Sequence, residues 1–92
     1  MIETSLNSEC FTLRATGQLT LRESGTVKDF LAQALERYRE IEVDLSAVEV
    51  IDLPCLQLLY CAKQLARESV RRPQFRVILP EGLMRGLAHG EP

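Results

Sequence analysis

The chain has 92 residues, of which 46% are hydrophobic and 26% charged, with a formal net charge of −2. This length predicts a single domain over residues 1–92, and the composition is typical of globular proteins. The eleven Lys and Arg residues are scattered except for Arg71 and Arg72, which disfavours nucleic acid as a partner. No apolar run reaches the roughly 20 residues that span a bilayer, and residues 1–9 are polar and acidic. We therefore expect a cytoplasmic protein without direct membrane insertion.

The first strongly patterned segment, residues 10–15, alternates between apolar and polar side chains as a half-buried strand does. Gly17 marks a tight turn, after which residues 18–21 can return as a second strand. The pattern predicts an N-terminal hairpin or bend built on Gly17.

From Val27 the apolar period becomes that of a helix, with Thr26 as its N-cap. The apolar residues of this helix recur at helical spacing and predict one core-facing stripe: Val27, Phe30, Leu31, Ala34, Leu35 and Tyr38.

A β-branched, apolar run over residues 41–45 and 48–51, interrupted by Ser46 and Ala47, predicts a buried strand that runs into an ordered loop. Asp52 can cap the helix that follows by accepting the N–H of Cys55, and Pro54 suits its first turn. The helix extends to about Ser69. Its predicted core stripe is Cys55, Leu58, Leu59, Ala62, Leu65 and Ala66.

Residues 75–79 predict another buried strand, and residues 81–89 predict a short closing helix. The order is ββαβαβα, and the strand-helix-strand unit in the middle predicts a parallel pair. The expected fold is an α/β sandwich, a four-stranded mixed sheet packed with about three helices. Its predicted core comprises Leu13, Leu19, Phe30, Leu35, Val43, Leu45, Leu58, Leu65, Val77 and Leu79.

Few residues carry the patterns of catalysis. The cysteines Cys10, Cys55 and Cys61 have no CxxC spacing, so we expect reduced thiols rather than a metal site. His89 is the single histidine, and no phosphate loop, HExxH or GxSxG motif is present. The acidic residues around residues 40–52 fit a solvated edge better than a metal site. We expect a protein that is not an enzyme and that has no cofactor.

One segment resembles a known family signature. DLSAVEVIDLPCLQLL, residues 44–59, is similar to the signature of the STAS domain, in which a strand ending Asp-Leu-Ser leads to Ile-Asp and a helix. GQLTL at residues 17–21 and FRVILP at residues 75–80 also look like parts of this family, so the resemblance covers nearly the whole chain. It implies a STAS-like fold and a non-catalytic, protein-binding role in a bacterial regulatory pathway, as in anti-sigma-factor antagonists.

The chain departs from the phospho-regulated antagonists at the positions that matter for their switch. In those relatives, the two positions after the signature Asp carry the Ser or Thr that a partner kinase phosphorylates. Here these positions are Leu53 and Pro54, and Cys55 replaces the Gly that follows. The resemblance therefore implies no phosphorylation at the family position.

The predicted partner-binding residues occupy the loop and outer side of the second helix: Asp52, Leu53, Pro54, Leu56, Gln57, Tyr60 and Gln64. Exposed apolar residues there would suit a protein interface, although Leu56 and Tyr60 could instead pack under a neighbouring loop. The resemblance implies a kinase-like anti-sigma factor as partner. Two alternatives remain: a small STAS accessory subunit of a phospholipid-transport ABC ATPase, which docks on the ATPase subunit, and a thiol redox protein that uses Cys55, whose place at a helix start could lower its pKa.

Overall fold

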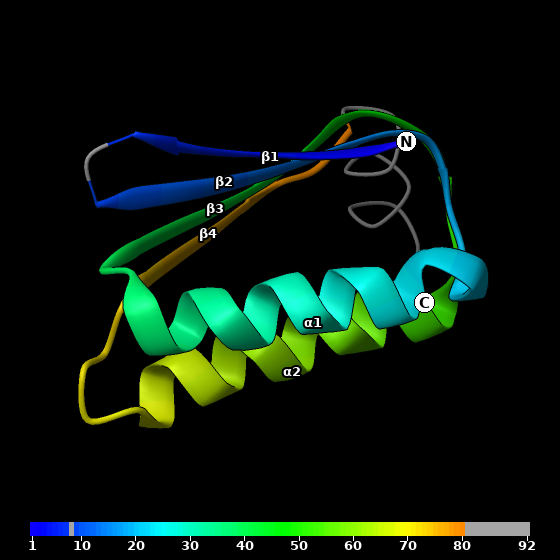
Figure 1. Cartoon of the computed structure of the whole chain (residues 1–92). Coiled ribbons are helices and arrows are strands. Elements are labelled where there is room, and N and C mark those ends of the chain that lie inside the picture. The colour runs from blue at the N-terminus through cyan, green and yellow to red at the C-terminus, as the bar shows by residue number, and fades with distance from the viewer. Residues whose placement is uncertain (8, 81–92) are drawn as a thin grey trace.

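The computed structural model describes residues 1–7 and 9–80. Its elements, in chain order, are β1 (Ile2–Asn7), β2 (Cys10–Leu19), α1 (Leu21–Arg37), β3 (Glu40–Ile51), α2 (Leu53–Glu68) and β4 (Gln74–Ile78). Figure 1 shows a sheet with both helices packed on one face. The predicted α/β fold with a four-stranded mixed sheet is confirmed. The predicted closing helix over residues 81–89 lies outside the described residues.

The sheet order is β1-β2-β3-β4, with β1 antiparallel to β2 and the pairs β2–β3 and β3–β4 parallel. The helices α1 and α2 are therefore the two crossover connections between parallel neighbours. Because both connections step in the same direction across the sheet and such crossovers are right-handed, both helices cover the same face. The starts of α1 and α2 and the carboxyl ends of the parallel strands β2, β3 and β4 consequently lie at one end of the molecule (Figure 1).

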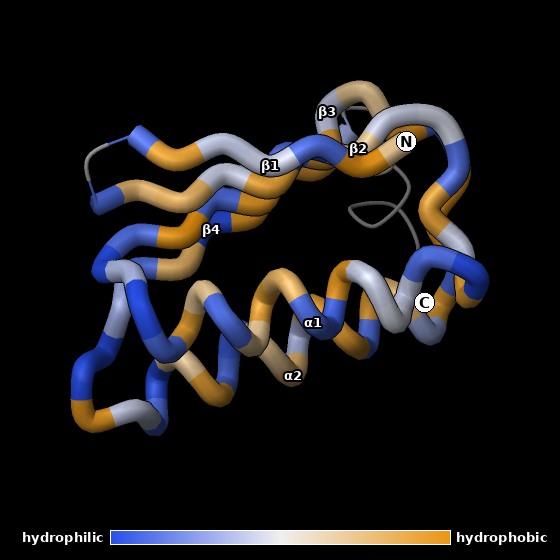
Figure 2. The backbone as a smooth tube through the Cα atoms, in the orientation of Figure 1, coloured by the Kyte–Doolittle hydropathy of each residue, from blue (hydrophilic) through white to orange (hydrophobic). Residues whose placement is uncertain are grey.

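The core lies between this face of the sheet and the two helices. Hydrophobic and hydrophilic residues alternate along the strands in Figure 2. In β2 and β3 the alternate apolar residues are the buried ones. Burying such a set removes apolar surface from water, which is the main stabilising contribution in a domain of this size. The buried hydrophobic residues are Phe11, Leu13, Ala15, Leu19, Val27, Leu31, Ala34, Ile41, Val43, Leu45, Val48, Cys55, Leu59, Ala62 and Ala66.

The predicted hairpin between residues 10–15 and 18–21 is wrong. Residues 10–19 form the single strand β2, and the hairpin joins it to β1, which pairs from Ile2 opposite Ala15 to Asn7 opposite Cys10. Strand β1 lies at the edge of the sheet, and its residues after Ile2 are exposed. An exposed edge strand needs no apolar alternation, so the sequence pattern contained no signal for it.

Gly17 lies inside β2 and is not a turn between two strands. Its φ of 76° lies in the left-handed region that favours glycine, and the pairing with β3 shifts register between Gly17 and Gln18. A second shift lies between Arg14 and Thr16, and at each of the two shifts β3 has one residue more than β2. The ladder thus continues to Leu19 opposite Ile51, and the predicted loop at Ser46 and Ala47 is instead part of one long strand.

Helix α1 starts at Leu21, six positions before the predicted start, and its N-cap is Thr20 rather than Thr26. The backbone N and Oγ1 of Thr20 each donate to Oε1 of Glu23 at 3.0 Å, and the backbone bond is the one that the Glu of a capping box makes. The early turns of α1 are largely exposed, so the apolar period becomes visible only at Val27.

The predicted core is right in its centre and wrong at one position. Leu13, Leu19, Val43 and Leu45 are buried, and Phe30, Leu35, Leu58, Val77 and Leu79 are partly buried against the core. Leu65, by contrast, is 57% exposed. The buried stripe of α2 runs through Cys55, Leu59, Ala62 and Ala66, so Leu58 lies at its margin and Leu65 lies beyond it.

Candidate functional site

Asp52, at the end of β3, connects the N-termini of both helices. Its Oδ1 accepts a hydrogen bond from the backbone N of Cys55 at 3.2 Å, as predicted, which caps α2. Its Oδ2 accepts another from the backbone N of Leu21 at 2.7 Å, the first residue of α1. Burial raises the pKa of this carboxyl group, but the hydrogen bonds from Cys55 and Leu21 outweigh burial, and the net pKa is lowered. One ionised side chain thus fixes two helix starts beside each other.

Most of the predicted partner-binding residues lie on the accessible side of α2. Leu53 and Tyr60 are each 64% exposed. Gln64 donates from Nε2 to the hydroxyl of Tyr60 at 3.0 Å, which positions the phenol along the helix. We call this set the α2 surface; it consists of Asp52, Leu53, Pro54, Gln57, Tyr60 and Gln64.

Leu56 is half-buried, as are Asp52 and Gln64, whereas Leu53, Pro54, Gln57 and Tyr60 are exposed. Its position on α2 turns it partly toward the body of the domain. It therefore offers a partner less apolar area than Tyr60 does.

Two exposed apolar residues that sequence reasoning did not select lie near Asp52. Leu21 is 64% exposed and Val50 is 50% exposed. The hydrogen bond from Leu21 to Asp52 places Leu21 beside the start of α2, and Val50 is two residues before Asp52. Sequence reasoning placed Leu21 at the end of a strand over residues 18–21, whereas Thr20 and Glu23, three residues apart, were the signal that α1 begins there. The apolar surface at this end therefore extends beyond α2.

Cys55 does not have the properties that a reactive thiol requires. Its side chain is buried, and burial together with the hydrogen-bonded carboxylate of Asp52 raises its pKa to about 12. The expectation that the helix start could lower this pKa is therefore wrong, because desolvation and the nearby negative charge outweigh the helix dipole. Cys10 is partly buried and Cys61 is exposed, and all three cysteines are free.

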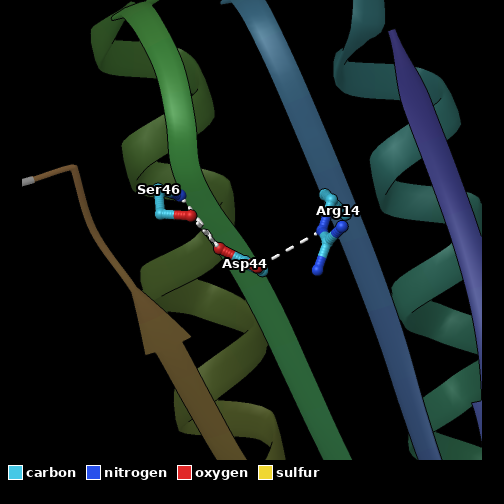
Figure 3. A network of polar contacts seen from close by, with 3 residues as sticks. All are labelled: Arg14, Asp44 and Ser46. Carbon is cyan, nitrogen blue, oxygen red and sulfur yellow. Dashed lines mark hydrogen bonds and ion pairs between the residues drawn. The ribbon is translucent and has the colours of Figure 1, made fainter.

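Two acidic residues of β3, Asp44 and Glu42, take part in contacts across the open face of the sheet. Asp44 accepts hydrogen bonds at Oδ1 from the backbone N of Ser46 at 3.0 Å and from its Oγ at 2.7 Å, and its Oδ2 pairs with Nε of Arg14 at 3.3 Å (Figure 3). The hydrogen bonds from Ser46, and then the charge of Arg14, lower the pKa of Asp44. Glu42 pairs with Arg76 at 2.7 Å. These contacts hold the bulged part of β3 in place and leave the carboxylates with protein partners.

The sequence matches one protein family over most of its length. The family described as "Mlab, STAS domain" matches residues 2–87. The chain is a STAS domain. No curated protein matches its sequence.

Solved structures agree with this assignment. An anti-sigma factor antagonist from Mycobacterium paratuberculosis superposes with a TM-score of 0.78 at 14% identity, over 97% of this chain and 74% of that one. The unphosphorylated anti-sigma factor antagonist SpoIIAA, of Bacillus, gives 0.76 at 13% identity, over 100% and 84% of the two chains. A STAS domain from Rhodobacter sphaeroides gives 0.59 at 22% identity, over 85% and 84%. At these identities the likeness is one of fold.

Within residues 1–7 and 9–80, no helix of this STAS domain has the length and hydrophobicity that crossing a membrane requires. The family match and the solved structures of similar fold support the resemblance to anti-sigma-factor antagonists that the segment at residues 44–59 indicated.

Proposed function

We propose that this STAS domain is a non-catalytic protein-interaction module that works in the bacterial cytoplasm and binds its partner through the α2 surface. The observation that carries the proposal is the exposure of Leu53 and Tyr60, each 64%, on a helix whose start Asp52 fixes. Large apolar side chains on a rigid helix start bind well because little conformational entropy is lost on association.

The first candidate partner is a kinase-like anti-sigma factor. The fold neighbours described as anti-sigma factor antagonists support it. Because Leu53 and Pro54 carry no hydroxyl, such a partner could not switch this module by phosphorylating the family position. The module would remain in a single binding state and act as a constitutive member of its regulatory pathway.

The second candidate partner is the ATPase subunit of a phospholipid-transport ABC complex. The observation that favours it is the description of the matching family, "Mlab, STAS domain", which does not name an antagonist. An accessory subunit of this kind would also need no phosphorylation switch, so the residues at Leu53 and Pro54 fit it equally.

Affinity purification of the tagged chain from its native host, with the Tyr60→Glu variant purified in parallel, tests the proposal. We expect a stoichiometric protein that is present with wild type and depleted with the variant. A kinase-like protein selects the first candidate and an ABC ATPase the second. Identical recovery of every copurifying protein by wild type and Tyr60→Glu would contradict the role of the α2 surface.

A further inference from the structure

The end of the molecule opposite Asp52 contains a polar hollow of about 470 Å³. Both the connection from α1 to β3 and the connection from α2 to β4 lie at this end (Figure 1). Three of its five lining residues are arginines: Arg39, Glu40, Arg71, Arg72 and Gln74. We call it the arginine hollow.

Sheet topology explains why these arginines meet although they are far apart in sequence. Arg39 directly precedes β3, and Arg71 and Arg72 come just before β4. Parallel strands begin at the same edge of a sheet, and the register places Glu40 opposite Gln74. The backbone N of Gln74 also donates to the carbonyl of Arg39 at 2.8 Å. Two lining residues, Glu40 and Gln74, thus begin paired strands, and the three arginines lie in the connections that lead into those strands.

The guanidinium groups of Arg71 and Arg39 each have a protein partner, whereas that of Arg72 has none within residues 1–7 and 9–80. Arg71 donates to the carbonyl of Glu36 in the last turn of α1, which orients its side chain. Arg39 pairs with Glu9 at 3.2 Å, but both side chains are well exposed, so the pair is weak. Arg72 has no hydrogen bond or ion pair from its side chain to any residue among 1–7 and 9–80. The hollow thus holds one oriented guanidinium and one that is available to a ligand.

The backbone of Arg72 gives a separate reason to assign its side chain a role. Its φ of 48° is the one positive value at a non-glycine residue in the described part of the chain. This left-handed conformation favours glycine, because a Cβ atom crowds the backbone there. An arginine at this position is a poor choice for the turn alone, and such local strain is often associated with function.

We propose that the arginine hollow binds a phosphate monoester or inorganic phosphate, independently of the partner at the α2 surface. Planar guanidinium groups donate paired hydrogen bonds to phosphate oxygens, and a tetrahedral dianion can engage more than one arginine at once. Glu40 lowers the net positive charge of the hollow, so the site is suited to weak, reversible binding rather than permanent occupancy.

Titration of the ¹⁵N-labelled protein with inorganic phosphate, followed by NMR at constant ionic strength, tests the site. We expect saturable shifts of Arg39, Arg72 and Gln74. Arg72→Gly should weaken binding by roughly two- to fivefold, the effect of one exposed ion pair, while the melting temperature stays the same or rises because glycine suits this φ. Arg22→Gln removes an equal charge at the other end of α1 and should leave the affinity unchanged.

Vesicles distinguish the source of the phosphate group. Binding to vesicles that contain phosphatidic acid, with loss in Arg72→Gly but not in Arg22→Gln, identifies a lipid headgroup, whereas saturation by inorganic phosphate alone identifies a free phosphate. Equal weakening of vesicle binding by both variants indicates unspecific charge attraction and contradicts the site. Linear, unsaturable shifts with phosphate, or equal phosphate affinity of Arg72→Gly and wild type, would also overturn it.

Discussion

The Oδ2 atom of Asp52 accepts the backbone N–H of Leu21 at 2.7 Å across a separation of 31 residues. Its Oδ1 atom simultaneously accepts the N–H of Cys55. We expect Asp52→Ala to lower the melting temperature by several degrees, because both helix starts lose an acceptor. Amide hydrogen exchange at Leu21 and Cys55 should accelerate together, whereas Asp29→Ala, an exposed acid of α1, should change neither. Acceleration at Cys55 alone would show that Asp52 does not link the helices.

Leu31 lies on the buried face of α1, and Leu65 lies on an exposed face of α2. Leu31 is 2% exposed and Leu65 is 57% exposed. Leu31→Ala should cost about 2 to 5 kcal/mol in the free energy of unfolding, because a cavity remains in the core. Leu65→Ala should change it by less than about 0.5 kcal/mol, as a surface substitution does. Urea denaturation measures both, and a large loss in Leu65→Ala would mean that α2 is rotated relative to the arrangement described.

Acid should destabilise the domain through Asp44 and Asp52. In the folded state their pKa values lie below 3.8, the ordinary value for Asp. Each ionised carboxylate therefore stabilises the fold at pH values above the unfolded pKa. This contribution is lost as the pH falls through the folded-state values, that is, below about pH 4. Asp44→Asn should flatten this acid limb of the stability curve, and Glu49→Gln, an exposed acid on the same strand, should not. Parallel pH curves for wild type and Asp44→Asn would argue against the contacts with Ser46 and Arg14.

Much of the fold and of the site could be predicted from local signals in the sequence. The cap between Asp52 and Cys55 depends on residues three apart and is confirmed. The bond from Asp52 to Leu21 could not be predicted, because it depends on tertiary packing across 31 residues. Strand β1 was missed because an exposed edge strand needs no apolar period. The arginine hollow depends on the register of two parallel strands, which sequence periodicity does not specify.

Leu53 and Pro54 have no hydroxyl group, which predicts that a kinase-like partner does not switch this module by phosphorylating these positions. Both residues are exposed at the start of α2, where a phosphate would add close to two negative charges. After incubation with a copurified kinase and ATP, mass spectrometry should find no phosphoryl group on the peptide around Asp52. Pro54→Ser restores a hydroxyl at an accessible site, and its modification would show that the surface is recognised. Phosphate on Ser46 or Ser24 of the unmutated protein, with loss of binding, would show that a switch exists elsewhere.

The affinity of the Tyr60→Glu variant for the purified partner tests the interaction surface most directly. Tyr60 is 64% exposed and Leu65, on another side of the same helix, is 57% exposed, so Leu65→Glu is a matched control. We expect calorimetric binding to be lost in Tyr60→Glu and retained in Leu65→Glu, with both variants keeping the wild-type circular dichroism spectrum and melting temperature within a few degrees. Wild-type affinity in a folded Tyr60→Glu variant would contradict the α2 surface as the partner-binding site.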